Sequence, residues 1–247
     1  MALQPKPYLQ EVSVRWETVS DDGGYPFDIP AIRNLNGLEF HSDVTFLVGE
    51  NGSGKSTLLE GVALALGFGP EGGTKNVRFQ TAQTVSPLHE HLKLARSYKT
   101  PKDHYFLRAE SFYNVATYMD ETGYLDGYGG KSLHHRSHGE SFMTLLTTKL
   151  RGKGLYLLDE PEAALSPTRQ LAALSAIHHL VEEDSQFIIA THSPILLSYP
   201  SAKIMLLDSS GITEVSYEDT EHYSITRDFL NHYRRRLETL LADEDDA

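Results

Sequence analysis

The sequence contains no cysteine, and this absence excludes two classes of structure. A chain without thiols has neither a disulfide framework nor a thiolate metal site, which fits a reducing cytoplasm. Positive charge is also scarce, because 22 Lys and Arg residues stand against 34 Asp and Glu residues and give a formal net charge of −12. We therefore expect the surface as a whole to repel nucleic acid and anionic lipid, so that any phosphate ligand must be held by a local binding site.

Long apolar runs are missing as well. Runs such as 155–158 and 187–190 are far shorter than the roughly 20 residues that a membrane helix needs. The first ten residues lack the charged and then apolar pattern of a signal peptide. With 247 residues, 40% of them hydrophobic and 23% charged, the chain fits a single domain over residues 1–247. These features predict a cytoplasmic protein with no direct membrane insertion.

Apolar periodicity predicts strands that alternate with helices along most of the chain. In residues 1–43, apolar and polar residues alternate in short stretches separated by turn residues, which indicates antiparallel strands. Residues 69–150 are predicted as a small helical and loop lobe, with loops and a short helix over 69–103. Further strands are expected at 44–48, 105–108, 154–158, 186–190, 203–207 and 211–217, helices at 56–64, 111–120, 141–150, 167–183, 194–198 and 221–240, a flexible link at 123–130 and an acidic tail at 241–247. This alternation predicts an α/β fold with a mostly parallel central sheet.

A glycine-rich turn follows the predicted strand 44–48 and precedes a predicted helix. Residues 49–57, GENGSGKST, match the pattern G-x-x-x-x-G-K-[ST]. Small residues let consecutive backbone N–H groups form an anion nest at the start of the helix, Lys55 reaches the β- and γ-phosphates, and the Ser56 hydroxyl can ligate Mg²⁺. The alternative is a turn that only caps a helix, but the sequence of strand, loop and helix favours phosphate binding.

Two further strands end in chemically active side chains. Asp159 and Glu160 follow strand 154–158, and His192 follows strand 186–190, so all three should lie at the carboxyl edge of a parallel sheet. One carboxylate can hold Mg²⁺ and the other can polarise an attacking water, while the histidine can hydrogen-bond that water or a γ-phosphate. The alternatives are acids that cap the next helix and a histidine with a structural role.

A weaker motif, Ser-His-Gly-Glu-Ser, lies at 137–141 and opens the predicted helix 141–150. Serine and glycine at a helix N-terminus can recognise a second phosphate, although the same residues also form an ordinary helix cap.

In this order and spacing, the motifs at 49–57, 137–141, 155–167 and 190–194 resemble the nucleotide-binding domain of the ABC ATPase superfamily, and more narrowly its soluble RecF/SMC-like branch. The resemblance implies a P-loop NTPase fold and an ATP-sandwiched homodimer in which each signature motif closes over the opposite protomer's nucleotide. It implies these roles: ATP binding by Asn51, Gly52, Ser53, Gly54, Lys55, Ser56 and Thr57 and, from the signature motif, by Ser137 and Gly139; Mg²⁺ binding by Ser56 and Asp159; catalysis by Glu160 as base and His192 as switch histidine; and a D-loop at 164–166.

The chain also departs from the superfamily pattern. The signature has His138 and Glu140 where transporter domains usually have glycine and glutamine, and the D-loop has Ser166 where aspartate is common. No glutamine follows strand 105–108 directly, so the Q-loop role falls to Glu110 or, less well, to Gln83. The adenine-stacking aromatic is Tyr25 or Phe27, unless both belong to the core. About a hundred residues separate Lys55 from Asp159, which is too few for a long coiled coil.

Three functions follow as hypotheses. The first is a soluble Mg²⁺-dependent ATPase that drives an event on an unidentified protein partner, with a role on DNA in repair or defence. Two groups of basic residues would serve the DNA role, or else are ordinary solvated surface: Lys93, Arg96, Lys99 and Lys102, and Arg234, Arg235 and Arg236. The second is the ATP-binding subunit of a membrane transporter. The third is an ATP-sensing switch without turnover, against which Glu160 and His192 argue.

Overall fold

A six-stranded sheet forms the centre of the computed structural model, which describes residues 6–20, 24–75, 85–109, 114, 117 and 137–242. Its strand order is β5-β6-β7-β3-β8-β9, and all neighbours are parallel except the antiparallel pair β8 and β9. The strands are β3 (Val44–Val48), β5 (Asp103–Arg108), β6 (Gly154–Asp159), β7 (Gln186–Ala190), β8 (Lys203–Asp208) and β9 (Gly211–Val215). The mostly parallel α/β sheet expected from the sequence is confirmed.

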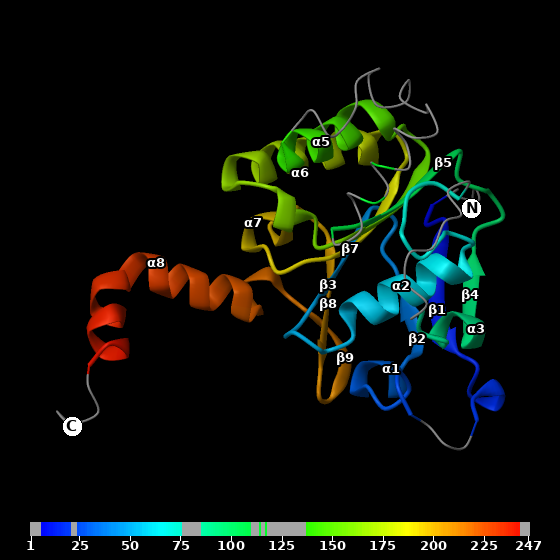
Figure 1. Ribbon diagram of the computed structural model, residues 1–247, viewed down its shortest axis with the longest axis horizontal. Coiled ribbons are helices and arrows are strands. Elements are labelled where there is room, and N and C mark those ends of the chain that lie inside the picture. The colour runs from blue at the N-terminus through cyan, green and yellow to red at the C-terminus, as the bar shows by residue number, and fades with distance from the viewer. Residues whose placement is uncertain are drawn as a thin grey trace.

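Several strands of this sheet are continuous apolar runs in the sequence, because both faces of the sheet are covered. Side chains of β3, β6 and β7 alternate between two buried clusters, as Phe46 and Leu47 do on β3. One cluster lies under α5 (His138–Thr144), the π-helical turn Leu145–Lys149, α6 (Pro167–Glu182) and α7 (Pro194–Leu197). The other lies under α1 (Pro30–Arg33), α2 (Lys55–Ala65) and α3 (Leu88–His91). In Figure 1, α5 and α6 accordingly lie on the opposite side of the sheet from α2.

A second sheet of three antiparallel strands packs beside α2. Its order is β2-β1-β4, from β1 (Leu9–Val14), β2 (Asn36–Glu39) and β4 (Leu92–Arg96). The first two are the antiparallel strands expected within residues 1–43. The expectation of loops across 69–103 is wrong for β4, although α3 is a short helix there. Three apolar residues in five are too few to identify a strand from the sequence, and pairing with β1 is what makes 92–96 extended.

The last helix, α8 (Glu221–Leu240), leaves the body of the protein and projects away from it, as Figure 1 shows. Short 3₁₀ turns lie at Trp16–Thr18, Pro161–Ala164 and Tyr217–Asp219. Among the residues that the structure describes, none of the helices has the length and apolar character to cross a bilayer. The link at 123–130, Glu110 and Gln83 lie outside the described residues, as do most of the helix expected at 111–120 and of the tail at 241–247.

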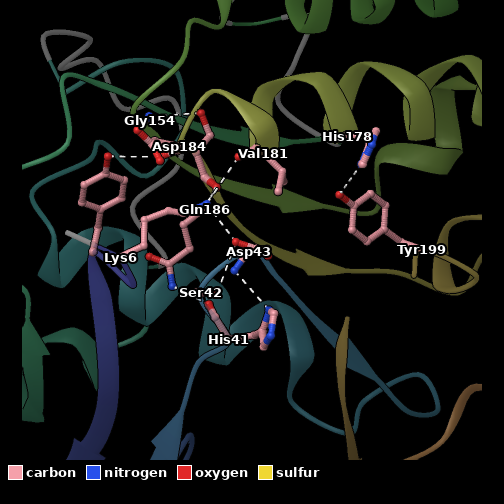
Figure 2. A network of polar contacts seen from close by, with 12 residues as sticks. Lys6, His41, Ser42, Asp43, Gly154, His178, Val181, Asp184, Gln186 and Tyr199 are labelled. Carbon is pink, nitrogen blue, oxygen red and sulfur yellow. Dashed lines mark hydrogen bonds and ion pairs between the residues drawn. The ribbon is translucent and has the colours of Figure 1, made fainter. Parts of the chain in front are cut away.

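A polar network ties the two sheets together at the amino edge of the central sheet (Figure 2). The buried amide of Gln186, at the start of β7, accepts from the backbone N–H of Leu9 at 3.0 Å and donates to the carbonyls of Leu9 at 2.9 Å and His41 at 3.0 Å. Lys6 donates to Asp43 at 2.8 Å, directly before β3. These contacts fix β1 against the central sheet, so the opposite, carboxyl edge is left for the chemistry of the site.

Candidate active site

The loop that joins β3 to α2 is shaped by glycines at positions where a side chain does not fit. Gly49 has a φ of 145°, and a Cβ added there would overlap the carbonyl oxygen of Leu207 on β8. Gly54 has a φ of 99° and caps α2, whose first residue is Lys55, one residue before the predicted start. Asn51 and Gly52 form the exposed tip of the loop, while Gly54 and Lys55 are buried. The backbone N–H groups of the first turn of α2 therefore face this loop.

The side chain of Lys55, the first residue of α2, points back into the loop. Its Nζ donates to the carbonyl oxygens of Gly49 and Glu50, both at 2.8 Å, and only 4% of the residue is exposed. Burial lowers the pKa of Lys55, and the nearby carboxylates of Glu160 and Asp159 oppose that shift. The lysine is therefore a buried cation directed at the loop, with acidic groups nearby.

Ser56 and Asp159 come together from distant parts of the sequence. The Ser56 hydroxyl donates to Oδ1 of Asp159 at 3.0 Å, across 103 residues of chain. Two hard oxygen donors at a phosphate loop fit Mg²⁺, which takes one or two protein ligands and completes its shell with water and phosphate oxygens. Within the described ranges, no group of three or more His, Asp or Glu residues is arranged to hold a metal ion alone.

Glu160 follows β6 in a left-handed backbone conformation, with φ at 50° and ψ at 51°. Such a conformation costs about 1–3 kcal/mol in a residue other than glycine and recurs at functional sites, although Lys153, Asp184 and Ser201 also have positive φ here, away from this site. The strand order brings His192 close to it: β7 pairs with both β3 and β6, so His192, which follows β7, lies beside the carboxyl ends of both strands. Its Nε2 is 3.8 Å from Oε1 of Glu160.

His192 is held on its other sides by two residues to which the sequence analysis assigned no role. Its backbone N–H donates to Oε1 of Glu162 at 2.5 Å, and its Nδ1 lies 3.0 Å from Nε2 of His222. Burial raises the pKa of Glu162 and lowers the pKa of both histidines, with Lys55 adding to the depression at His192. The Nε2 atom of His192 is buried and has no hydrogen-bond partner among the described residues.

The signature residues make a separate cluster. Ser137 caps α5 in a capping box with Glu140, at 3.3 Å and 2.9 Å, and its hydroxyl also accepts from Arg169 at 3.1 Å. Gly139 is buried, and an added Cβ would lie 2.9 Å from the carbonyl oxygen of Ala164, so the signature packs on the segment predicted as the D-loop. The described hydrogen bonds of Ser137 stay within this cluster and do not reach the loop at 49–57.

The two aromatic candidates for adenine stacking have different environments. Phe27 is buried and packs edge-on against Trp16 and His91, so it is a core residue. Tyr25 is 63% exposed, and its hydroxyl lies 3.4 Å from Oγ1 of Thr57. The alternative that both belong to the core is therefore wrong for Tyr25.

His222 and Glu162 are the site residues that sequence reasoning missed. Glu162 stands in the Glu-Pro-Glu run after β6, which marks it as unusual without indicating that it faces His192. His222 lies 30 residues beyond His192, on α8, and no spacing rule connects the two.

The chain is similar to several known proteins. A family model described as an AAA domain matches residues 27–111, about a third of the chain. A protein of Methanothermobacter thermautotrophicus named as an ABC transporter ATP-binding protein is 26% identical over 211 residues, which covers 76% of this chain and 73% of that protein. The energy-coupling factor transporter ATP-binding protein EcfA2 of Methanospirillum hungatei is 26% identical over 226 residues, 80% of this chain but only 55% of that protein.

Among solved structures, an SMC head bound to the C-terminal winged-helix domain of ScpA is similar with a TM-score of 0.49 and 13% identity, over 86% of this chain and 99% of that one. The parallel sheet, the phosphate loop and the AAA-domain match define the chain as an ATP-hydrolysing P-loop enzyme. The relatives named above are ABC-type ATP-binding proteins, and the chain is similar to them over most of its length.

Proposed function

We propose that the chain hydrolyses ATP with Mg²⁺ as an ATP-sandwiched dimer and serves as the nucleotide-binding subunit of a larger assembly. The observation that carries this proposal is the convergence of three strand ends: the loop with Lys55, the Ser56–Asp159 pair, and Glu160 beside His192. A cytoplasmic location is part of the same proposal and rests on the absence of cysteine.

The residues divide the chemistry among them. The backbone of 51–57 and the Lys55 ammonium bind the phosphates, and Ser56 and Asp159 hold Mg²⁺, which when bound offsets the charge of the phosphoryl group. Glu160 holds the attacking water and accepts its proton, since its carboxylate stands at the strand end beside the metal ligands. His192 directs Nε2 toward the same place and donates to the oxygen on which negative charge develops.

The dimer is proposed because the site is incomplete within one protomer. Ser137 and Gly139 lie in the α5 cluster on Arg169 and Ala164, where their hydrogen bonds stay local. In a head-to-tail pair related by a two-fold axis, each loop would meet the other protomer's signature, and two nucleotides would be enclosed at one interface.

Phosphate release by the purified chain tests the proposal. We expect Mg²⁺-dependent release in the wild type, loss of about 100-fold or more in Glu160→Gln, where the base is replaced by an amide of the same shape, and loss of nucleotide binding in Lys55→Ala. Equal rates for the wild type and Glu160→Gln would remove Glu160 as the base. Tight nucleotide binding without release in the wild type would instead favour the ATP-sensing switch.

The names of the curated relatives favour a transporter subunit over DNA repair or defence as the larger role. Such a subunit needs no membrane segment of its own, because it works on a permease. Co-purification of a permease with the tagged chain from its own cells would support this role, and capture of soluble partners alone would count against it.

The DNA role and the RecF/SMC-like branch remain predictions. The basic residues proposed for the DNA role are exposed, which does not distinguish DNA binding from ordinary solvated surface, and Arg236 is already paired with Asp228. A DNA-stimulated turnover that falls steeply with salt would favour this role, whereas absence of DNA binding at low salt would exclude it.

A further inference from the structure

The side of His192 that faces away from Glu160 is closed by His222, which no motif includes. Nδ1 of His192 lies 3.0 Å from Nε2 of His222, and the ring centres are 5.1 Å apart. Both side chains are partly buried. The pair is therefore a defined contact between two imidazoles, one at the end of β7 and one on the first turn of α8.

We propose that His222 is a positioning residue for His192: it donates its Nε2–H to Nδ1 of His192 and thereby keeps the proton of His192 on Nε2, facing Glu160. The proposal rests on the function proposed above for His192. Two neutral imidazoles share one hydrogen bond in either of two directions, and the direction decides which nitrogen of His192 carries the proton.

Electrostatics selects the direction. The Nε2 atom of His192 is buried, lacks a hydrogen-bond partner among the described residues, and lies 3.8 Å from a carboxylate oxygen of Glu160. A lone pair there would face negative charge, whereas an N–H is attracted to the carboxylate and, in the working site, to phosphate oxygen. The N–H therefore belongs on Nε2, which leaves Nδ1 as an acceptor that only a donor such as His222 satisfies.

The first turn of α8 is anchored so that it can hold this contact. The Tyr217 hydroxyl donates to the carbonyl of Pro194, two residues beyond His192, at 2.7 Å. Buried Thr220 donates to the Tyr217 carbonyl at 2.7 Å and caps α8 by accepting from the backbone of Tyr223 at 3.3 Å. The Tyr217 and Tyr223 rings pack with centres 4.6 Å apart. Since α8 has no buried residue of its own, these contacts before and at its first turn position His222.

Two substitutions at this position separate a hydrogen bond from packing. His222→Phe keeps a ring and removes the nitrogen, whereas His222→Gln keeps an amide N–H at similar reach. We expect His222→Phe to lower kcat about tenfold, the equivalent of 1.4 kcal/mol, with KM for ATP changed less than about twofold, and His222→Gln to recover most of the loss. His178→Phe is the matched control, because it removes a histidine Nδ1 contact to the Tyr199 hydroxyl, 3.1 Å long, away from the site.

A second readout does not depend on turnover. Imidazole nitrogen shifts in ¹⁵N-histidine-labelled protein without nucleotide report the tautomer, and we expect His192 to be the Nε2–H form in the wild type and a mixture in His222→Phe. An unchanged tautomer together with unchanged kcat would overturn the proposal, as would equal losses in His222→Phe and His222→Gln. If Glu160→Gln turns over like the wild type, the proposed function fails instead, and the tautomer measurement still decides the role of His222.

Discussion

Two alanine substitutions three residues apart test whether the phosphate loop has the tight geometry described. Gly49 and Gly52 both have positive φ, at 145° and 81°, so alanine is strained at either position. They differ in their surroundings. A Cβ at Gly52 would meet nothing within 4 Å, whereas a Cβ at Gly49 would overlap the Leu207 carbonyl and lie 2.8 Å from Oγ of Ser53.

The difference in cost follows from these surroundings. Gly52→Ala carries only backbone strain, about 1–2 kcal/mol. Gly49→Ala carries backbone strain of about 1–3 kcal/mol and, because a β8 carbonyl cannot rotate away as a side chain can, an overpacking cost of about 1–3 kcal/mol more. We expect a total loss of about 3 kcal/mol or more in the free energy of unfolding for Gly49→Ala.

Urea unfolding measures both variants on the same scale. With a slope of about 3 kcal/mol per molar urea for a chain of this size, Gly49→Ala should lower the midpoint by about 1 M and Gly52→Ala by about half of that or less. Equal midpoints for the two variants would show that the approach of Gly49 to β8 is not the constraint, and would refute the packing argument.

Three further outcomes are expected. Gln186→Leu, which leaves the backbone groups of Leu9 without partners, should cost about 2–4 kcal/mol in urea unfolding, and a cost below about 1 kcal/mol would contradict the account of the sheet contacts. Ser56→Ala should raise the Mg²⁺ concentration for half-maximal turnover about tenfold, and an unchanged Mg²⁺ dependence would remove it as a ligand. Burial lowers the pKa of His192 and His222 in the folded chain, so below about pH 6.5 the unfolded chain binds more protons than the folded chain. Stability should therefore fall between about pH 7 and pH 5, more in the wild type than in His222→Phe, as urea midpoints at both pH values would show.

The sequence predicts those features that depend on local patterns. Continuous apolar runs identify β3, β6 and β7, since strands buried on both faces need no alternation. The glycine pattern at 49–57 identifies the loop because its backbone requires residues without a Cβ. The same logic predicts chemically functional side chains at the strand ends, and in the structure the Ser56 hydroxyl donates to Asp159 at the end of β6.

Features that depend on contacts distant in the chain are not predictable in this way. Strand β4 has too few apolar residues to identify and forms by pairing with β1. The position of β7 between β3 and β6, which brings His192 beside Glu160, is a matter of strand order that no residue pattern encodes. The contact of His222 with His192 depends on how α8 is anchored through the 3₁₀ turn before it, so it becomes visible only in three dimensions.

The most direct test of the central claim is the mass of Glu160→Gln in solution, measured by size-exclusion chromatography with light scattering. If Glu160 is the base and the site is completed by a second protomer, this variant should hold uncleaved ATP and accumulate as a dimer of twice the 27.6 kDa chain mass in saturating Mg·ATP. The same variant with Mg·ADP, and Lys55→Ala with Mg·ATP, should remain monomeric. A monomeric Glu160→Gln protein in saturating Mg·ATP would contradict the sandwiched dimer.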